Sequence, residues 1–122
     1  MNAAQTFTTS SLFQQGANPA IAKGEKAGEM SQVFEKAAEY FTLLSEPSRL
    51  RILQAICYEE RSVQEVVDCT GLPQPNVSRH LALLHRSGVL SRRRSGTSVF
   101  YRVSDATITE LCRLVCVRMS SA

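Results

Sequence analysis

Hydrophobic side chains recur at helical spacing along most of the chain, in segments separated by short breaks rich in proline, glycine and serine. The first segment predicts an amphipathic helix that begins near Ser31. Its apolar positions are Val33, Phe34, Ala37, Ala38, Phe41 and Leu44. Pro47 suits the first turn of a second helix, which should run to about Tyr58. Residues 1–30 are rich in small and polar residues with little periodicity, so we expect a flexible N-terminal arm there.

A capping box predicts the start of a third helix, because Ser62 and Glu65 can satisfy each other's backbone donors. Gly71 is a natural left-handed end for this helix. Only residues 72–75 separate it from a fourth helix, which should close at Gly88. The inward-facing positions of the fourth helix are Val77, Leu81 and Leu84. Two helices joined by a glycine-containing turn are the signature of a helix-turn-helix.

Two β-prone segments within residues 89–103 flank a basic, glycine-containing turn, which predicts a hairpin. A last helix is expected from about Asp105 to Met119. Its apolar stripe consists of Ile108, Leu111, Cys112, Val115, Cys116 and Met119. Helices followed by a hairpin and a final helix predict a mainly α (α+β) fold, a winged helix-turn-helix, over residues 31–119. No internal repeat or second domain is visible.

Charge is distributed very unevenly along the chain, although its formal net value is only +3. Between Cys69 and Ser104 there are six arginines and both histidines but no aspartate or glutamate. The arginines are Arg79, Arg86, Arg92, Arg93, Arg94 and Arg102. A run of charge is often only a solvated face. A local basic surface within a helix-turn-helix, however, suits a polyanion, because neutralised phosphates release counterions.

The exposed side of the fourth helix carries side chains that can read bases. If Val77 and its apolar neighbours face the core, the exposed candidates are Gln74, Asn76, Ser78 and Arg79. Amide and guanidinium groups pair with adenine and guanine edges, and the N-terminal end of a recognition helix enters the major groove. For His80 we expect a phosphate contact or a packing role. The three arginines Arg92, Arg93 and Arg94 should lie at the hairpin tip and hold the DNA backbone together with Arg102.

Several segments resemble the ArsR/SmtB family of winged-helix repressors. They read LLSEPSRLRIL from residue 43, QPNVSRHLALL from residue 74, GVL from residue 88 and FYRV from residue 100. The resemblance covers roughly residues 31–119. It implies a homodimer formed by the first and last helices, bound to an inverted-repeat operator in double-stranded DNA and released by an inducer. An architectural DNA-binding module is the other reading of the same fold.

The standard sensing sites of that family are not matched. The stretch that carries thiols in arsenic and cadmium sensors reads ERSVQ here, over residues 60–64, and has no cysteine. For the zinc site of the last helix, the resemblance retains Asp105. Thr107, Arg118 and Ser121 occupy the positions of the other ligands. A zinc site of histidine and carboxylate is therefore not expected.

Thiols remain as candidates for sensing. Cys112 and Cys116 share a helix face with Cβ atoms ~5–6 Å apart, and Cys57 can join them if the second and last helices touch. Three thiolates would suit a thiophilic inducer such as As(III), Sb(III), Cd(II) or Hg(II). Alternatively, Cys57 forms a disulfide or polysulfide with Cys112 or Cys116, as in some sulfur sensors of the family, or all three are core residues. Cys69 is interpreted as structural.

Other classes of protein receive no support from the sequence. There is no nucleophile elbow, phosphate-binding glycine loop or paired-carboxylate motif, so we do not expect an enzyme or a required cofactor. No apolar run approaches the ~18 residues of a membrane span. The N-terminus lacks the pattern of a secretory signal, which predicts a cytoplasmic protein with reduced cysteines.

Overall fold

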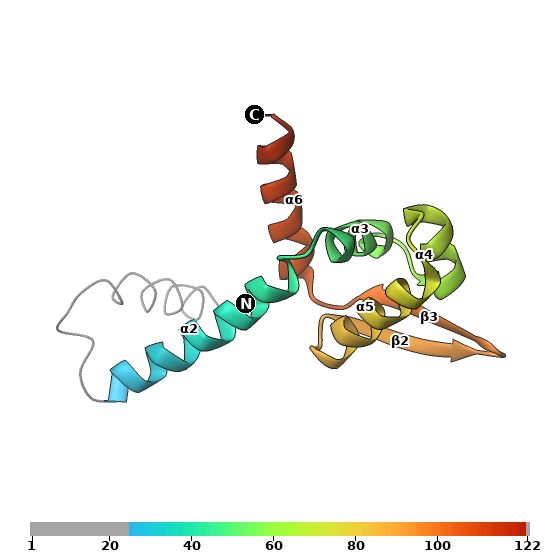
Figure 1. The fold of residues 1–122 in the computed structure, drawn as a ribbon. Coiled ribbons are helices and arrows are strands. Elements are labelled where there is room, and N and C mark those ends of the chain that lie inside the picture. The colour runs from blue at the N-terminus through green and yellow to red at the C-terminus, as the bar shows by residue number, and fades with distance from the viewer. Residues whose placement is uncertain (1–24, 122) are drawn as a thin grey trace. The chain divides into compact units, whose positions relative to one another are not determined.

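The computed structural model describes residues 25–121, and its elements follow the expected order with one addition (Figure 1). The helices are α2 (Glu25–Leu43), α3 (Pro47–Ile56), α4 (Val63–Thr70), α5 (Gln74–Arg86) and α6 (Ala106–Ser120). The strands are β1 (Arg61–Ser62), β2 (Leu90–Ser95) and β3 (Ser98–Val103). This is the predicted winged helix-turn-helix, with β1 as a strand that the sequence pattern did not predict.

The first helix is longer than expected. It begins at Glu25 rather than near Ser31, so the last part of the predicted arm is helical, and residues 1–24 lie outside the described range. The chain divides at Leu43 into two compact units, and α2 is therefore described by itself. Three of its large apolar side chains, Val33, Phe34 and Phe41, are exposed.

Local signals at the helix ends are confirmed where the sequence predicted them. Pro47 lies in the first turn of α3, although this helix ends at Ile56 and not at Tyr58. Both hydrogen bonds of the capping box form at the start of α4: the Glu65 amide donates to Ser62 Oγ at 3.2 Å, and the Ser62 amide donates to Glu65 Oε1 at 2.8 Å. Gly71 ends α4 in the left-handed region, with a φ of 73°.

The capping box gives a direct test of this local structure. Replacing Ser62 with alanine should lower the free energy of unfolding by about 1 kcal/mol, because the Glu65 amide loses its acceptor at the start of the helix. Urea denaturation at one fixed protein concentration would measure the change. Ser98→Ala is a suitable control, since Ser98 is exposed and we expect a change within ±0.5 kcal/mol there. Equal effects of the two substitutions would contradict the cap.

The hairpin forms a three-stranded antiparallel sheet in the order β1-β3-β2. Its turn is the two-residue Gly96-Thr97, and Gly96 has the positive φ of 64° that such a turn requires. The three consecutive arginines pair along β2 with Tyr101, Phe100 and Val99. The prediction that they lie at the hairpin tip is therefore wrong, because the glycine places the turn two residues beyond Arg94.

The core of the unit from Leu43 onward lies where α3, α4, α5 and the start of α6 meet the sheet. Val77, Leu81 and Leu84 of α5 are fully buried, as predicted. The other buried apolar residues of this unit are Ile52, Leu53, Ile56, Val66, Val89, Leu90, Tyr101 and Ile108. Within residues 25–121, no helix combines the length and apolar character needed to cross a membrane.

Candidate nucleic-acid interface and thiol pocket

The N-terminal half of α5 presents a polar surface. Gln74, Ser78 and Arg79 are exposed and Asn76 is half-buried, because the apolar positions of the helix face the core. Arg79 Nη2 donates to Asn76 Oδ1 at 3.1 Å, which holds a guanidinium and an amide side by side. The arrangement offers the donor and acceptor groups that read base edges in a major groove.

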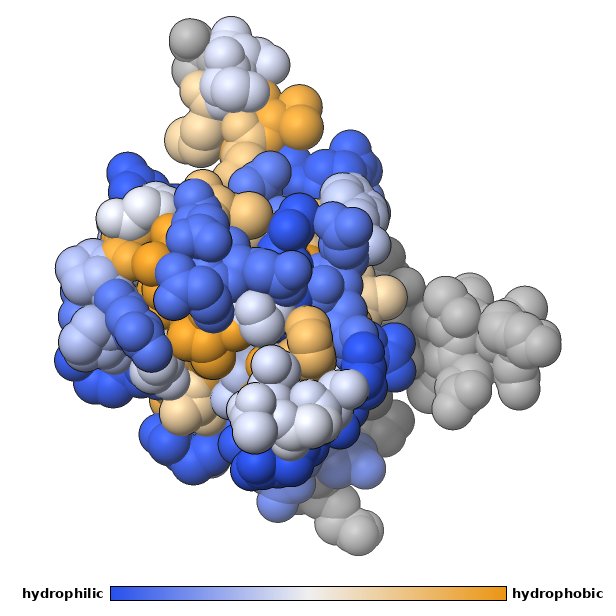
Figure 2. Space-filling view, turned by 90° about the vertical axis from the view of Figure 1, so that its right-hand side faces the viewer, coloured by the Kyte–Doolittle hydropathy of each residue, from blue (hydrophilic) through white to orange (hydrophobic). Residues whose placement is uncertain are grey.

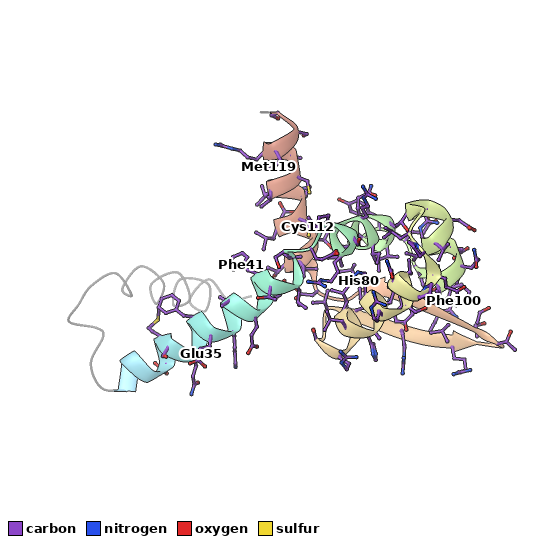
Figure 3. All side chains as sticks on the ribbon, in the orientation of Figure 1. Glu35, Phe41, His80, Phe100, Cys112 and Met119 are labelled. Atoms are coloured by element: carbon purple, nitrogen blue, oxygen red, sulfur yellow. The ribbon has the colours of Figure 1, made fainter. Side chains whose placement is uncertain are left out.

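His80, which is labelled in Figure 3, has different surroundings on α5. Its side chain is only 12% exposed, and its Nε2 atom is 4.0 Å from Oε1 of Glu46, the residue that caps α3. Burial lowers the pKa of His80, although the nearby Glu46 carboxylate acts in the opposite direction. The structure thus favours the packing role that was one of the two expectations for this histidine.

The arginines of the hairpin point to opposite faces of the sheet. Arg92 pairs with Tyr101, which is buried and contacts His85 of α5 edge-on, with ring centroids 6.3 Å apart. Because side chains alternate along a strand, Arg92 and Arg94 lie on the face of the sheet that carries Tyr101. Both are exposed, and within residues 25–121 neither forms an ion pair.

Arg93 lies on the other face and is already engaged. Its guanidinium donates to both carboxylate oxygens of Glu60 at 2.8–3.0 Å and lies 4.9 Å from the ring centroid of Phe100. Arg102 lies two residues after Phe100 on β3, so its side chain is on this second face too. The sequence interval without acidic residues is therefore partly neutralised in space by Glu60, which lies outside it.

The three candidate sensing cysteines line a single pocket of about 230 Å³ between α3 and α6. Cys57 contributes from the end of α3, Cys112 and Cys116 from α6 (Cys112 is labelled in Figure 3). The pocket walls are mainly apolar, and all three residues are free thiols. The condition that the second and last predicted helices touch is thus met.

The chemistry of the pocket is set by burial and by the neighbouring sulfurs. Burial raises the pKa of the Cys112 thiol, and Cys116 and Cys57 raise it further. Cys57 Sγ donates to the carbonyl oxygen of Gln54 at 3.3 Å. Among the described residues, no three cysteine, histidine or carboxylate side chains are close enough together to hold a metal ion. The predicted three-thiolate site is therefore not assembled in this conformation.

Helix α6 exposes several apolar side chains toward its end. Ile108 is buried at its start, whereas the distal part of the predicted stripe, including Val115, Cys116 and Met119, is exposed. Leu114 and Val117 are exposed as well. Figure 2 shows the contrast, with hydrophobic surface on α6 above a largely hydrophilic face.

Comparisons with known proteins agree with this geometry. Residues 46–92, which include the helix-turn-helix and the start of the wing, match the model of the "Bacterial regulatory protein, arsR family". An uncharacterized HTH-type transcriptional regulator of Methanocaldococcus jannaschii is 36% identical over 83 residues, which cover 67% of this chain and 93% of that protein. The chain belongs to the arsR family. It is a DNA-binding transcriptional regulator with a winged helix-turn-helix.

Two further proteins are similar to this arsR-family regulator. A Streptomyces lividans protein named "Probable mercury resistance operon repressor" is 39% identical over 80 residues, 66% of this chain and 64% of that protein. The solution structure of a homodimeric winged helix-turn-helix DNA-binding domain from Mycobacterium bovis matches with a TM-score of 0.67 at 26% identity. That match covers 80% of this chain and 88% of the other.

Sequence reasoning missed one residue of the candidate interface, Glu60. It precedes β1, and its partner Arg93 is 33 positions away in the chain. Periodicity and capping are local signals, and neither reports a pair at that separation. Only the pairing of β1 with β3 brings Glu60 beside the wing, and a two-residue strand leaves no pattern in the sequence.

Proposed function

We propose that this protein is a homodimeric transcriptional repressor that leaves its operator when an inducer reacts with the thiol pocket. The observation that carries the proposal is the meeting of Cys57, Cys112 and Cys116 around one pocket between α3 and α6. Helix α3 also packs against α5, the helix with the base-reading side chains. An event in the pocket can therefore reach the DNA-binding surface through a single helix.

On DNA, α5 would lie in the major groove. Gln74, Asn76, Ser78 and Arg79 would contact base edges, while Arg92 and Arg94 would bind phosphates beside it. Arg93 and Arg102 belong to the same basic wing and lie on its other face, where Glu60 binds Arg93. Because the partner is DNA, we expect the protein to act in the cytoplasm. An inverted-repeat operator would match the two-fold symmetry of a dimer.

The dimer would be formed by α2 and α6. Both helices expose large apolar side chains, including Phe34 and Phe41 on α2 and Leu114 and Met119 on α6. Apolar faces of this kind mark interaction surfaces in small domains. The homodimeric state of the structurally similar M. bovis domain supports this assignment.

The inducer we favour is a thiophilic ion that two thiolates can hold. Cys112 and Cys116 are one helical turn apart, so both sulfurs can approach one ion from the same face. Since a three-ligand group is not assembled among residues 25–121, an ion such as Hg(II) fits this pair better than As(III), Sb(III) or Cd(II). The mercury-related name of the Streptomyces relative points the same way.

A second candidate is a sulfur or oxidant sensor. A Cys112–Cys116 disulfide would be strained, because disulfides need Cβ atoms about 3.5–4.5 Å apart. Cys57 faces both residues across the pocket, so it would form the link between α3 and α6. Two thiols would lose two electrons and two protons to a sulfane-sulfur donor or an oxidant as the link forms.

Either event would act by a population shift. The inducer must stabilise a conformation of the dimer whose recognition helices no longer match the two half-sites. Coupling of this kind is typically worth about 1–3 kcal/mol, which corresponds to a loss of DNA affinity of roughly 5- to 150-fold. The arrangement needs no enzymatic step.

Fluorescence anisotropy of a labelled duplex, selected for binding from a random pool, would test the proposal. We expect Hg(II) to release the duplex, and the release to persist while a non-thiol phosphine reductant is present. Release only by a persulfide donor, reversed by the reductant, would favour the second candidate instead. Release by neither reagent would contradict the proposal and leave the cysteines without a sensing role.

A further inference from the structure

The hydrogen-bonded ion pair between Arg93 and Glu60 is the most highly organised polar contact on the wing. Arg93 Nε lies 3.0 and 2.9 Å from the two oxygens of Glu60, and Nη2 lies 2.8 Å from Oε1. The guanidinium also lies over the ring of Phe100, with Cζ 4.9 Å from the ring centroid. The long arginine side chain is thus fixed on one edge and one face, unlike those of Arg92 and Arg94.

The bound edge of Arg93 is the edge that a phosphate would use. Guanidinium groups bind carboxylates and phosphates through the same fork of two parallel N–H donors. Glu60 therefore accepts from the same guanidinium donors that a phosphate would use. Its side chain is 29% exposed and that of Arg93 is 56% exposed, so solvent and a polyanion can still reach the contact.

The carboxylate of Glu60 is ionised at neutral pH. Hydrogen bonds from Arg93 lower the pKa of Glu60, and the nearby positive charges of Arg93 and Arg102 lower it further. Glu60 consequently stays ionised through the neutral range, and it faces both arginines on this side of the sheet.

We propose that Glu60 is an internal competitor for DNA phosphates, which holds Arg93 back and thereby lowers the affinity of the wing for DNA of any sequence. The inference rests on the proposed role of the wing in DNA binding. Its consequence is specificity. Phosphate contacts do not depend on the DNA sequence, whereas contacts of the α5 side chains with bases do. If the phosphate contacts contribute less to the affinity, a larger share of it comes from the contacts that distinguish one sequence from another.

Neutralising Glu60 should strengthen binding to DNA. For Glu60→Gln on a mixed-sequence duplex, we expect about two- to fivefold tighter binding near 0.15 M salt, in line with the small value of an exposed ion pair. The slope of log K against log salt should steepen by roughly 0.9, the contribution of one additional phosphate contact. Anisotropy titrations at several salt concentrations would measure both quantities.

The neighbouring Glu59 provides a matched control. Its exposed carboxylate bonds to Arg61 and not to a wing arginine, so Glu59→Gln removes the same charge without releasing Arg93. Adding Arg93→Ala to Glu60→Gln should cancel the gain. If Glu59→Gln and Glu60→Gln act alike, the gain is general electrostatics and the competitor role is wrong.

Two other outcomes are decisive. Weaker binding by Glu60→Gln would mean that the carboxylate positions Arg93 for DNA, which overturns the competitor role while leaving the wing as a DNA contact. Failure of the unmodified protein to bind any duplex would instead contradict the proposed function itself. Thermal denaturation of each variant would show that the fold is retained, since Glu60 lies at the surface of the sheet.

Discussion

Replacing Arg92 and Arg94 together with alanine should weaken binding to duplex DNA about 30-fold near 0.15 M salt and lower the salt slope by roughly 1.8. The estimate assigns one phosphate to each arginine, with a slope of ~0.9 per contact. Both side chains are exposed on the face of the sheet that carries Tyr101, the residue in contact with α5. They are therefore the wing arginines that a duplex seated on α5 can contact without displacing Glu60.

Arg93 is the internal control for this experiment. It lies between the other two on the same strand and carries the same charge, but it points to the opposite face and is paired with Glu60. Arg93→Ala should change the affinity by about twofold or less, as expected for an exposed ion pair. Equal losses for Arg93→Ala and Arg94→Ala would show that the pair with Glu60 does not keep Arg93 from DNA. Salt titrations of both single variants would settle the comparison.

This contrast also shows how far the sequence could predict the wing. Three consecutive arginines and a glycine indicate a basic hairpin, but they do not fix the register. Gly96 can accommodate the positive φ of a two-residue turn, and that turn places the arginines along β2 with alternating directions. Which of the arginines has its charge neutralised then depends on Glu60, which only the fold brings close to Arg93. Composition alone gave all three arginines the same role.

Helix boundaries were predictable where a local chemical reason exists. The capping box at Ser62, the proline in the first turn of α3 and the left-handed Gly71 each act within one helical turn, and all three were confirmed. The start of α2 at Glu25 was not predicted, because Gly28 and the polar residues around it lack the apolar spacing that marked the rest of the helix.

The thiol pocket combines a local and a long-range relation. The spacing of Cys112 and Cys116 predicts a shared helix face, whereas Cys57 joins them only through the packing of α3 against α6. From the sequence, the approach of Cys57 to the other two thiols could be predicted only if the two helices were assumed to touch. The sequence could not show that the three thiols surround a pocket without forming a three-ligand group. That distinction separates the proposed two-thiolate ion site from the three-thiolate site that the sequence predicted.

The largest expected effect is the complete loss of induction when the pocket thiols are removed. Cys112→Ser with Cys116→Ser should bind DNA like the unmodified protein and should not respond to Hg(II), because serine is a poor ligand for a soft ion. The unmodified protein should lose about 5- to 150-fold in affinity under the same conditions. Cys69→Ser is the matched control: this exposed thiol of α4 lies outside the pocket, so induction should persist.

Cys57→Ser then separates the two candidate inducers. A two-thiolate ion site on α6 keeps its ligands in this variant, so Hg(II) should still release the DNA. A sulfur link between α3 and α6 cannot form without Cys57, and the response to a persulfide donor should vanish.

The direction of the pH effect adds a second test. Because burial raises the pKa of Cys112, its thiolate fraction at neutral pH is below that of an ordinary cysteine and grows as pH rises. Induction that depends on Cys112 should therefore become faster between pH 7 and 8 in stopped-flow release measurements, and a pH-independent rate would show that thiolate formation does not limit release.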